Sequence, residues 1–296
     1  MNSGMPLAGT DVGFIGLGLM GRPMSLNLLA AGARVIVHSR SPDPVQELAE
    51  AGAVPVSSPA SVAAKADTVI TMLPDTPAVE TVLLGTGGVV EGLKPGSLVI
   101  DMGTTGVMAT RDFAAAIEKA GGAYVDAPVS GGTIGAGDGT LVIMAGGSGE
   151  AVARARAIFG VLGSRATHVG AVGTGQVAKA ANQVIVGLNI GAVAEALTLA
   201  AKAGADPAKV REALRGGFAD SRILEVHGQR MVDGDFRPGG KMTTQFKDLT
   251  QALELAAELG FSLPATALNR DLYARLIEAG HGDLDHSALI KAIAED

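Results

Sequence analysis

The pattern of apolar and polar positions changes once along the chain, near residue 175. Before that point, short runs rich in Val, Ile and Leu alternate with longer segments whose apolar residues recur at helical spacing. The short runs predict strands, at Val12–Ile15, Arg34–His38, Val69–Leu73, Leu98–Asp101, Ala123–Val125, Leu141–Ala145 and Ala166–Val169. The longer segments predict helices, at Met20–Ala31, Pro44–Ala51, Pro59–Ala66, Ala78–Leu84, Met108–Ala120 and Glu150–Phe159. Nearly all-apolar strands that alternate with helices indicate a mostly parallel sheet covered on both faces.

Small residues mark several ends of these predicted helices. Ser58 precedes Pro59, a pair typical of a helix that begins with a side-chain cap and a proline in its first turn. Gly32 and Gly52 stand where two other helices should end.

The second part of the chain is predicted to be entirely helical. A helix of about seven turns is expected from Gln176 to Gly204, and Asp206-Pro207 should cap the next one. Further helices are predicted at Ser221–Val232, Thr243–Leu259, Pro264–Ala279 and Ser287–Ala294. We therefore expect an α/β domain over residues 1–172 and an all-α domain over residues 173–296, linked by the long helix.

The most apolar stretch of that long helix, Val184–Ala201, has the length of a membrane span. Asn189 and Glu195 interrupt it, and Asn182 and Lys202 flank it. We therefore expect a buried helix and no membrane partner.

Composition narrows the class of protein. The chain has 296 residues, of which 47% are hydrophobic and 18% charged, so that it can bury a sizeable core. Its formal net charge of −7, without a cluster of Lys or Arg, argues against a nucleic-acid partner. Cysteine is absent, which excludes disulfides, thiolate metal ligands and cysteine nucleophiles. Met1–Thr10 lacks a cationic stretch followed by a long apolar one, so we expect no signal peptide and a cytoplasmic protein.

A glycine-rich loop directly follows the first predicted strand. Gly16 should permit its tight turn, Gly18 should let a pyrophosphate approach the backbone, and Gly21 should let the next helix pack on the strand. Free N–H groups at that helix N-terminus attract an anion. The loop therefore predicts a dinucleotide site in a Rossmann-type doubly wound domain, the alternative being a tight turn that binds nothing. The residues of the site are Gly16, Leu17, Gly18, Leu19, Met20 and Gly21.

The end of the second predicted strand bears on the choice between NAD(H) and NADP(H). An acidic residue about twenty positions beyond the loop would bind the ribose 2′-hydroxyl of NAD. The sequence there is His38-Ser39-Arg40-Ser41, in which Arg40 can pair with a 2′-phosphate. We expect Ser39 and Arg40 to contact a preferred NADP(H), with NAD(H) possible. The alternative is a solvated Arg40 and dual cofactor use.

Three later segments place polar residues in apolar surroundings. The first is Asp126–Gly132, where Ser130 and two following glycines offer a hydroxyl and backbone N–H groups to a carboxylate. The second is Gly175–Asn182, where Lys179 and Asn182 lie three positions apart and share a helix face. The third is Phe246–Leu249, at the start of an amphipathic helix. A lysine on a long Ala-rich helix is costly to bury unless it has a partner or a function, so a structural Lys179 stays open at this point.

In these segments, and in their order and spacing, the chain resembles the β-hydroxyacid dehydrogenases. The resemblance extends over nearly the whole chain, from the Gly16–Pro23 loop to Asp285–Leu289. It implies an NAD(P)-dependent oxidoreductase that reduces a small carboxylated aldehyde. Ala181–Val186, Arg215–Gly217 and Asp285–Leu289 favour tartronate semialdehyde as that aldehyde.

The resemblance also implies roles for individual residues. Lys179 would be the general acid and base of catalysis, assisted by Ser130 and Asn182. The substrate would be held by Ser130, Gly131, Gly132, Asn182 and Lys247. Thr104, Leu73, Pro74 and Lys247 would contact the cofactor. A homodimer or homotetramer built through the helical domain is implied as well.

One segment departs from the family pattern, which usually has two hydroxyl residues followed three positions later by a proline. Here Gly103 takes the first hydroxyl position and Val107 takes that of the proline, while Thr104 still supplies one hydroxyl. The departure bears on substrate preference. Alternatives are 3-hydroxyisobutyrate, glyoxylate or succinic semialdehyde as substrate, imine reduction, and a non-catalytic nucleotide-binding scaffold.

One cluster of polar residues and one single aspartate have simpler explanations than catalysis. Histidine and aspartate gather over residues 281–286, but Asp285 is expected to cap a helix that opens near Ser287, and no metal is expected. Asp126 is expected to form a turn, because it lies at a strand end two positions before a proline.

Overall fold

The computed structural model describes residues 5–294. The expectation of no signal peptide in the first ten residues therefore lies partly outside the described residues. The chain divides into two compact units between Lys179 and Ala180. The predicted domain boundary at residues 172/173 lies at the start of the helix in which this division falls, and the units are described separately below.

The first unit is built on a sheet of nine strands among the described residues. Their order is β3-β2-β1-β4-β5-β6-β8-β7, and β9 also pairs with β8. β1 to β6 are paired in parallel, whereas β8 runs antiparallel to both β6 and β7. The strands are β1 (Asp11–Ile15), β2 (Arg34–His38), β3 (Val54–Pro55), β4 (Thr68–Thr71), β5 (Leu98–Asp101), β6 (Ala123–Asp126), β7 (Val129–Ser130), β8 (Leu141–Gly146) and β9 (Gly163–Gly170).

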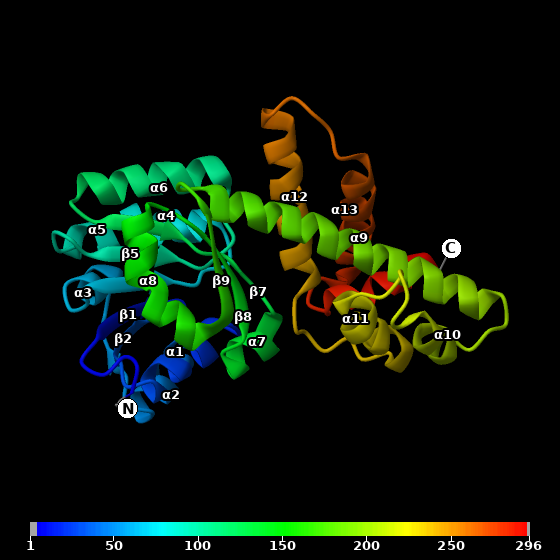
Figure 1. The fold of residues 1–296 in the computed structure, drawn as a ribbon, viewed down its shortest axis with the longest axis horizontal. Helices are drawn as coiled ribbons and strands as arrows, with labels where there is room; N and C mark the ends of the chain where they lie inside the picture. Colours follow the sequence, from blue (N-terminus) through cyan, green and yellow to red (C-terminus); the bar gives the residue numbers. More distant parts are fainter. Residues whose placement is uncertain (1–4, 295–296) are drawn as a thin grey trace. The chain divides into compact units, whose positions relative to one another are not determined.

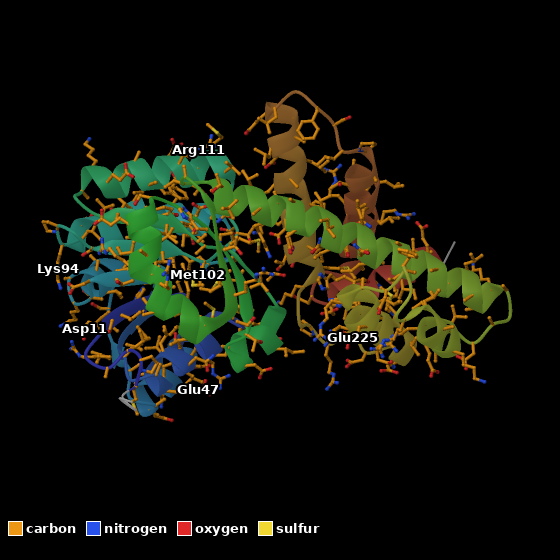
Figure 2. The ribbon with its side chains drawn as sticks, in the orientation of Figure 1. Asp11, Glu47, Lys94, Met102, Arg111 and Glu225 are labelled. Carbon is orange, nitrogen blue, oxygen red and sulfur yellow. The ribbon has the colours of Figure 1, made fainter. Side chains whose placement is uncertain are left out.

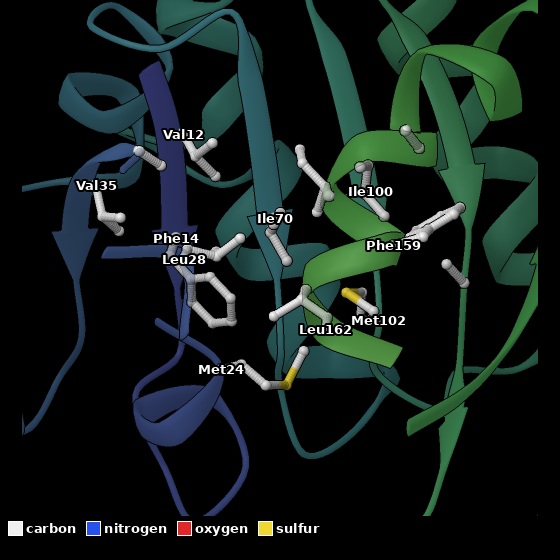
Figure 3. Close-up of a cluster of buried hydrophobic side chains, with 14 of the residues drawn as sticks. Val12, Phe14, Met24, Leu28, Val35, Ile70, Ile100, Met102, Phe159 and Leu162 are labelled. Carbon is white, nitrogen blue, oxygen red and sulfur yellow. The ribbon is translucent and has the colours of Figure 1, made fainter. Parts of the chain in front are cut away.

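Helices cover both faces of this sheet, as the apolar strands predict (Figure 1). They are α1 (Gly21–Ala30), α2 (Pro42–Glu50), α3 (Pro59–Ala63), α4 (Thr76–Leu84), α5 (Val89–Gly92), α6 (Val107–Lys119), α7 (Gly132–Asp138) and α8 (Gly149–Leu162). One core lies under α1, α2 and α8, and the other lies under α3, α4 and α6. Figure 3 shows the first, in which Phe14 of β1 and Ile70 of β4 pack with Leu28 of α1 and Leu162 of α8. Successive strand residues belong to opposite cores, as in Val35 and Ile36, because strand side chains alternate between faces.

All seven predicted strands of the first unit are present, with ends within a few residues of those expected. The hydrophobic pattern missed β3, β7, α5 and α7, which have two to seven residues each and are too short to show a period. The predicted boundary residues are confirmed: Ser58 accepts a hydrogen bond from Ser61 N at 3.1 Å, and Gly32 and Gly52 have φ of +90° and +101°.

Helix α9 (Thr174–Lys202) is the long helix that the sequence predicts. Among the helices of residues 5–294 it alone is long and apolar enough to cross a membrane. One third (33%) of its most apolar window is buried within the chain. A single helix of this kind is weak evidence for a membrane span, because core helices meet the same criterion.

The second unit contains the rest of α9 and a set of helices packed on a separate core. These are α10 (Pro207–Leu214), α11 (Arg222–Asp233), α12 (Met242–Glu258), α13 (Pro264–Leu276), η1 (Ile277–His281), η2 (His286–Leu289) and α14 (Ile290–Ala294). The core includes Ile190 and Leu197 of α9, Leu249 of α12 and Tyr273 of α13, which are all almost completely buried. The predicted caps Asp206 and Asp285 accept backbone N–H groups of Ala208 and Ser287.

A side-chain cap and two ion pairs lie at the N-terminal end of α11. Ser221 accepts the N–H of Leu224, and Glu225, labelled in Figure 2, pairs with Arg222 at 2.6 Å and Arg215 at 3.6 Å. Such exposed pairs contribute little to stability, but they hold the end of α10 beside α11.

Candidate active site

The glycine loop has the geometry that a dinucleotide pyrophosphate requires. Gly16 has φ of +99°, and a Cβ there would overlap the carbonyl oxygen of Met72. A Cβ on Gly21 would overlap the carbonyl oxygen of Gly16, so both positions need glycine for close packing. Around Gly18, by contrast, no atom lies within 4 Å of a built Cβ, which leaves room for a ligand to approach the backbone. No side chain caps the first turn of α1, and its N–H groups fit an anion.

Ser39 and Arg40 follow β2 and line an open pocket of about 370 Å³. His38, Pro55, Val56 and Ser57 line it as well. The Arg40 side chain is exposed and forms no hydrogen bond or ion pair within residues 5–294. Glu47 of α2, labelled in Figure 2, instead pairs with Arg22 of α1. Arg40 is therefore available to a ligand.

The other predicted cofactor residues follow the carboxyl ends of neighbouring strands. Leu73 and Pro74 come after β4, and Thr104 comes after β5. β1, β4 and β5 are adjacent and parallel, so these loops share an edge with the glycine loop. Open α/β sheets bind ligands at this edge.

Asp101 holds the loop that carries Thr104. The Asp101 carboxylate is fully buried and accepts hydrogen bonds from Thr71 Oγ1 at 2.8 Å and from Gly103 N at 3.1 Å. Burial raises the pKa of Asp101, although these hydrogen bonds favour its ionised form. A Cβ on Gly103 would lie 2.9 Å from the carbonyl oxygen of Leu73, so a larger residue would need a shift of the backbone. Glycine at this position is therefore required by the packing of this loop.

The first unit brings the lysine of α9 to the predicted carboxylate cradle. Lys179 is only 8% exposed, and its Nζ donates a hydrogen bond of 2.7 Å to the carbonyl oxygen of Val129. Ser130 follows directly, and Gly131 and Gly132 begin α7 with φ of +136° and +61°, which favours glycine at both positions. Lys179 and Ser130, far apart in the sequence, thus lie at one place in the fold.

Asp126 positions the start of α9 and with it Lys179. Its two carboxylate oxygens accept the backbone N–H groups of Gly173 at 2.8 Å and Gln176 at 2.9 Å. Burial, together with a smaller effect of the Asp101 charge, raises the pKa of Asp126 to about 6, against the effect of these two hydrogen bonds. The prediction that Asp126 forms a local turn is wrong, because its side chain bonds to backbone almost fifty residues away.

Gln176 ties the same helix turn to the Thr104 loop. Its Nε2 donates to the carbonyl oxygen of Gly103 at 2.9 Å, and its Oε1 accepts from the N–H of Thr105 at 3.2 Å. Gln176 is 2% exposed. Two hydrogen bonds therefore join the loop after β5 to the first turn of α9 within the first unit.

In the second unit, Asn182 and Lys247 are joined through two buried side chains. Lys247 Nζ lies 3.0 Å from Asp248 Oδ1, and Asp248 Oδ2 accepts a hydrogen bond of 2.6 Å from Gln183 Nε2. Gln183 Oε1 in turn accepts from Asn182 Nδ2 at 2.8 Å. A Gln245 side chain completes the group, since its Oε1 accepts from Gln183 Nε2 at 3.1 Å.

Known proteins match this chain over nearly its whole length. The model of the NAD-binding domain of 6-phosphogluconate dehydrogenase matches residues 11–170, and that of the NAD-binding domain of NADP-dependent 3-hydroxyisobutyrate dehydrogenase matches residues 173–293. The chain is 48% identical to 2-hydroxy-3-oxopropionate reductase of Escherichia coli, over 95% of this chain and 96% of that one. The chain belongs to the β-hydroxyacid dehydrogenase family.

Two further relatives support this assignment. The 2-(hydroxymethyl)glutarate dehydrogenase of Eubacterium barkeri is 37% identical over 95% of this chain and 93% of its own length. The structure of Mycobacterium tuberculosis 3-hydroxyisobutyrate dehydrogenase with L-serine superposes with a TM-score of 0.88 at 33% identity, covering 96% of this chain and 99% of that chain. The β-hydroxyacid dehydrogenase described here is accordingly an NAD(P)-dependent enzyme that acts on CH–OH groups, and the expected fold is confirmed.

The histidine-rich cluster of this β-hydroxyacid dehydrogenase is organised around Asp285. Both Asp285 oxygens accept hydrogen bonds: Oδ1 accepts the N–H and hydroxyl of Ser287, and Oδ2 accepts the N–H groups of Gly239 and Gly240. Arg230 is an ion-pair partner at 2.8 Å. His227 and His286 lie beside Asp285 within metal-ligand spacing. The carboxylate is already fully engaged by protein donors, which favours the predicted structural cap.

Sequence reasoning missed Gln176, Gln183 and Asp248 as part of the dehydrogenase site. Each is a buried polar side chain, and each contacts a loop or residue that the motifs do identify. The only signal in the sequence was position: Gln176 and Gln183 flank Lys179 on the long helix, and Asp248 follows Lys247.

Proposed function

We propose that this β-hydroxyacid dehydrogenase reduces tartronate semialdehyde (2-hydroxy-3-oxopropionate) to D-glycerate and prefers NADPH. The observation that carries the proposal is the buried Lys179 ammonium, bonded to Val129 O at 2.7 Å and next to Ser130. The reductase of Escherichia coli, 48% identical, bears the name of this reaction.

When bound, the nicotinamide cofactor supplies a hydride to the aldehyde carbon. Negative charge then develops on the carbonyl oxygen, where the Lys179 ammonium stabilises it and donates a proton. In the oxidative direction, neutral Lys179 removes the hydroxyl proton. The contact with Val129 O orients Nζ before substrate binds, which lowers the cost of reaching the reactive geometry.

Ser130 holds the substrate carboxylate with its hydroxyl and with the backbone N–H groups that follow at Gly131 and Gly132. The hydroxyl of Ser130 has no partner within residues 5–294, so it is available for this contact. We also assign to Asn182 and Lys247, as the family resemblance implies, polar contacts with the substrate, and to Lys247 a contact with the cofactor.

Cofactor contacts come from the loops at the carboxyl edge of the sheet. Residues Gly16 to Gly21 hold the pyrophosphate, Leu73, Pro74 and Thr104 follow it towards the nicotinamide, and Ser39 and Arg40 bind the 2′-phosphate of NADPH. The exposed and unpaired Arg40 supports the preference for NADPH over NADH.

The enzyme works as a cytoplasmic homodimer or homotetramer with no nucleic-acid or membrane partner. Ile185 and Leu199 of α9 are 62% and 72% exposed in the single chain, and a second copy would cover such apolar side chains. In this proposal, residues 1–172 form the domain that binds the cofactor. Residues 173–296 form the domain that contributes to substrate binding and to assembly of the oligomer.

Oxidation of NADPH with a panel of aldehydes tests the proposal. Tartronate semialdehyde should give the highest kcat/KM, followed by methylmalonate semialdehyde, with glyoxylate and succinic semialdehyde lower. A higher kcat/KM for methylmalonate semialdehyde would make the enzyme a 3-hydroxyisobutyrate dehydrogenase instead, the activity named for the Mycobacterium tuberculosis relative. Turnover of cyclic imines alone would indicate an imine reductase, and no turnover at all would indicate a nucleotide-binding scaffold.

A further inference from the structure

Gln183 occupies the centre of the polar group in the second unit and bonds to three other side chains. Its side chain is 8% exposed, and those of Asp248 and Gln245 are 3% and 1% exposed. Burying so many polar atoms is costly unless they are paired, and here they pair with one another. Such a group requires a functional or structural reason.

The orientation of each amide in this group is determined by its neighbour. Asp248 is ion-paired with Lys247, and a carboxylate in that state has oxygens that only accept hydrogen bonds. The Gln183 atom facing Asp248 must therefore be the NH₂ nitrogen, which also donates its second hydrogen to Gln245 Oε1. A reversed Gln183 amide would place its oxygen against two other oxygens.

The same reasoning fixes Asn182. Because Gln183 Nε2 faces Asp248, Gln183 Oε1 faces Asn182 and accepts from its NH₂ group at 2.8 Å. The amide oxygen of Asn182 is then left without a donor among the described residues. It offers an acceptor and can recognise only a group that donates a hydrogen bond.

We infer that Gln183 is a positioning residue that turns the Asn182 amide oxygen towards a hydroxyl group on C2 of the substrate. This inference rests on the proposed function, in which Asn182 contacts the substrate. A carboxylate, a methyl group or a hydrogen at that point donates nothing to Asn182 Oδ1. A site built to pair with a hydroxyl rejects analogues that lack it, because its own polar group is left unpaired. Gln183 and Asp248 therefore make the enzyme selective for 2-hydroxy substrates.

The reverse reaction tests this inference with stable compounds that differ only at C2. Glycerate has a hydroxyl there, 3-hydroxypropanoate has hydrogen, and 3-hydroxyisobutyrate has methyl. With NADP⁺, the wild-type kcat/KM should be more than tenfold higher for glycerate than for 3-hydroxypropanoate. Gln183→Met removes the polar link at similar side-chain volume and should reduce this ratio about tenfold. Loss of one hydrogen bond to substrate has an effect of this order.

Two further variants and one control distinguish a loss of selectivity from a simple loss of folding. Gln183→Asn keeps an amide but is too short to reach both Asp248 and Asn182, and Asp248→Asn removes the acceptor-only oxygens; both should lower the same ratio. Asn189→Ala is the matched control, because Asn189 lies on the same helix and bonds only to the backbone oxygen of Ile185. It should leave the ratio unchanged.

The outcomes separate the inference from the proposed function. Equal losses of kcat/KM on all three alcohols in the Gln183 variants, with the ratio preserved, would indicate a merely structural residue and overturn the inference alone. A wild-type enzyme that oxidises all three alcohols with equal kcat/KM would also overturn the inference alone. A wild-type enzyme that binds NADP⁺ and oxidises none of them would overturn the proposed function as well.

Discussion

Lys179 Nζ donates a hydrogen bond of 2.7 Å to the carbonyl oxygen of Val129, the residue directly before Ser130. The two residues are fifty positions apart in the chain, and the contact joins the helix that carries the proposed acid to the strand end that carries the proposed carboxylate cradle. Asp126 and Gln176 also hold this part of the helix, through hydrogen bonds to the Gln176 N–H and to the carbonyl oxygen of Gly103. The lysine is therefore fixed in place without any help from a bound ligand.

Replacement of Lys179 by alanine should abolish turnover while leaving the cofactor site intact. We expect kcat to fall by several orders of magnitude, since both charge stabilisation and proton transfer are lost. NADPH binding, followed by its fluorescence, should persist. Lys202→Ala, at the exposed end of the same helix, is the control and should keep wild-type kcat. Near-normal turnover of Lys179→Ala would reject the lysine as the acid.

Replacement of Arg40 by alanine should weaken the use of NADPH and leave that of NADH nearly unchanged. A charge-assisted contact to the 2′-phosphate corresponds to about a tenfold to hundredfold loss in kcat/KM for NADPH. Arg34→Ala is a suitable control, because Arg34 begins the strand that Arg40 follows and is paired with Asp11 at 3.1 Å. An enzyme that already prefers NADH before mutation would contradict the assignment of Arg40.

The elements that the sequence predicts correctly are those with local causes. The three inner residues of strand β2 (Arg34–His38) are apolar, and Ser58 caps a helix by accepting the N–H of the residue three positions later, so both features can be read from adjacent residues. The glycine loop belongs to this class in part: Gly21 is required by the carbonyl oxygen of Gly16, five positions away, whereas Gly16 is required by that of Met72, which follows the neighbouring strand β4.

Contacts between distant segments could not be predicted in this way. Nothing near Asp126 in the sequence indicates that its carboxylate binds the N–H groups of Gly173 and Gln176. Gln183 likewise reads as one more polar residue on a long apolar helix until α12 places Asp248 beside it. Such residues take their roles from tertiary packing, which local patterns do not encode.

Asp126 should make the stability of the enzyme fall as the pH rises from 4 to 7. Its pKa is about 6 in the folded protein against 3.8 as the reference value, so the folded state keeps a proton that the unfolded state has released in this range. The shift corresponds to about 3 kcal/mol in the free energy of unfolding. Urea unfolding at several pH values should show this decrease in the wild type relative to Asp126→Asn. Parallel curves for the two proteins would contradict the raised pKa.

Asp285 should act on stability in the opposite direction. Burial would raise its pKa, but the neighbouring His227 and His286 rings and the hydrogen bonds from Ser287 lower the pKa well below the usual range. The folded state then keeps the carboxylate ionised at a pH where the unfolded chain binds a proton. Its stabilising contribution is therefore complete above about pH 4 and is lost as the pH falls further.

Asp285→Asn should lower the free energy of unfolding at pH 7 by about 3 kcal/mol or more, because Arg230 and four other donors would face an amide that can only partly accept them. Urea unfolding measures the change, and the acid-dependent loss of the wild type should be smaller in the variant. Asp283→Asn provides the control, since its carboxylate is exposed and pairs only with Lys241, so that the unfolding midpoint should hardly change. If both variants shifted the midpoint equally, the donors around Asp285 would not be the cause. A large loss confined to Asp285→Asn would instead confirm that the cap, rather than a surface charge, joins residues 239–240 to the last helices of the chain.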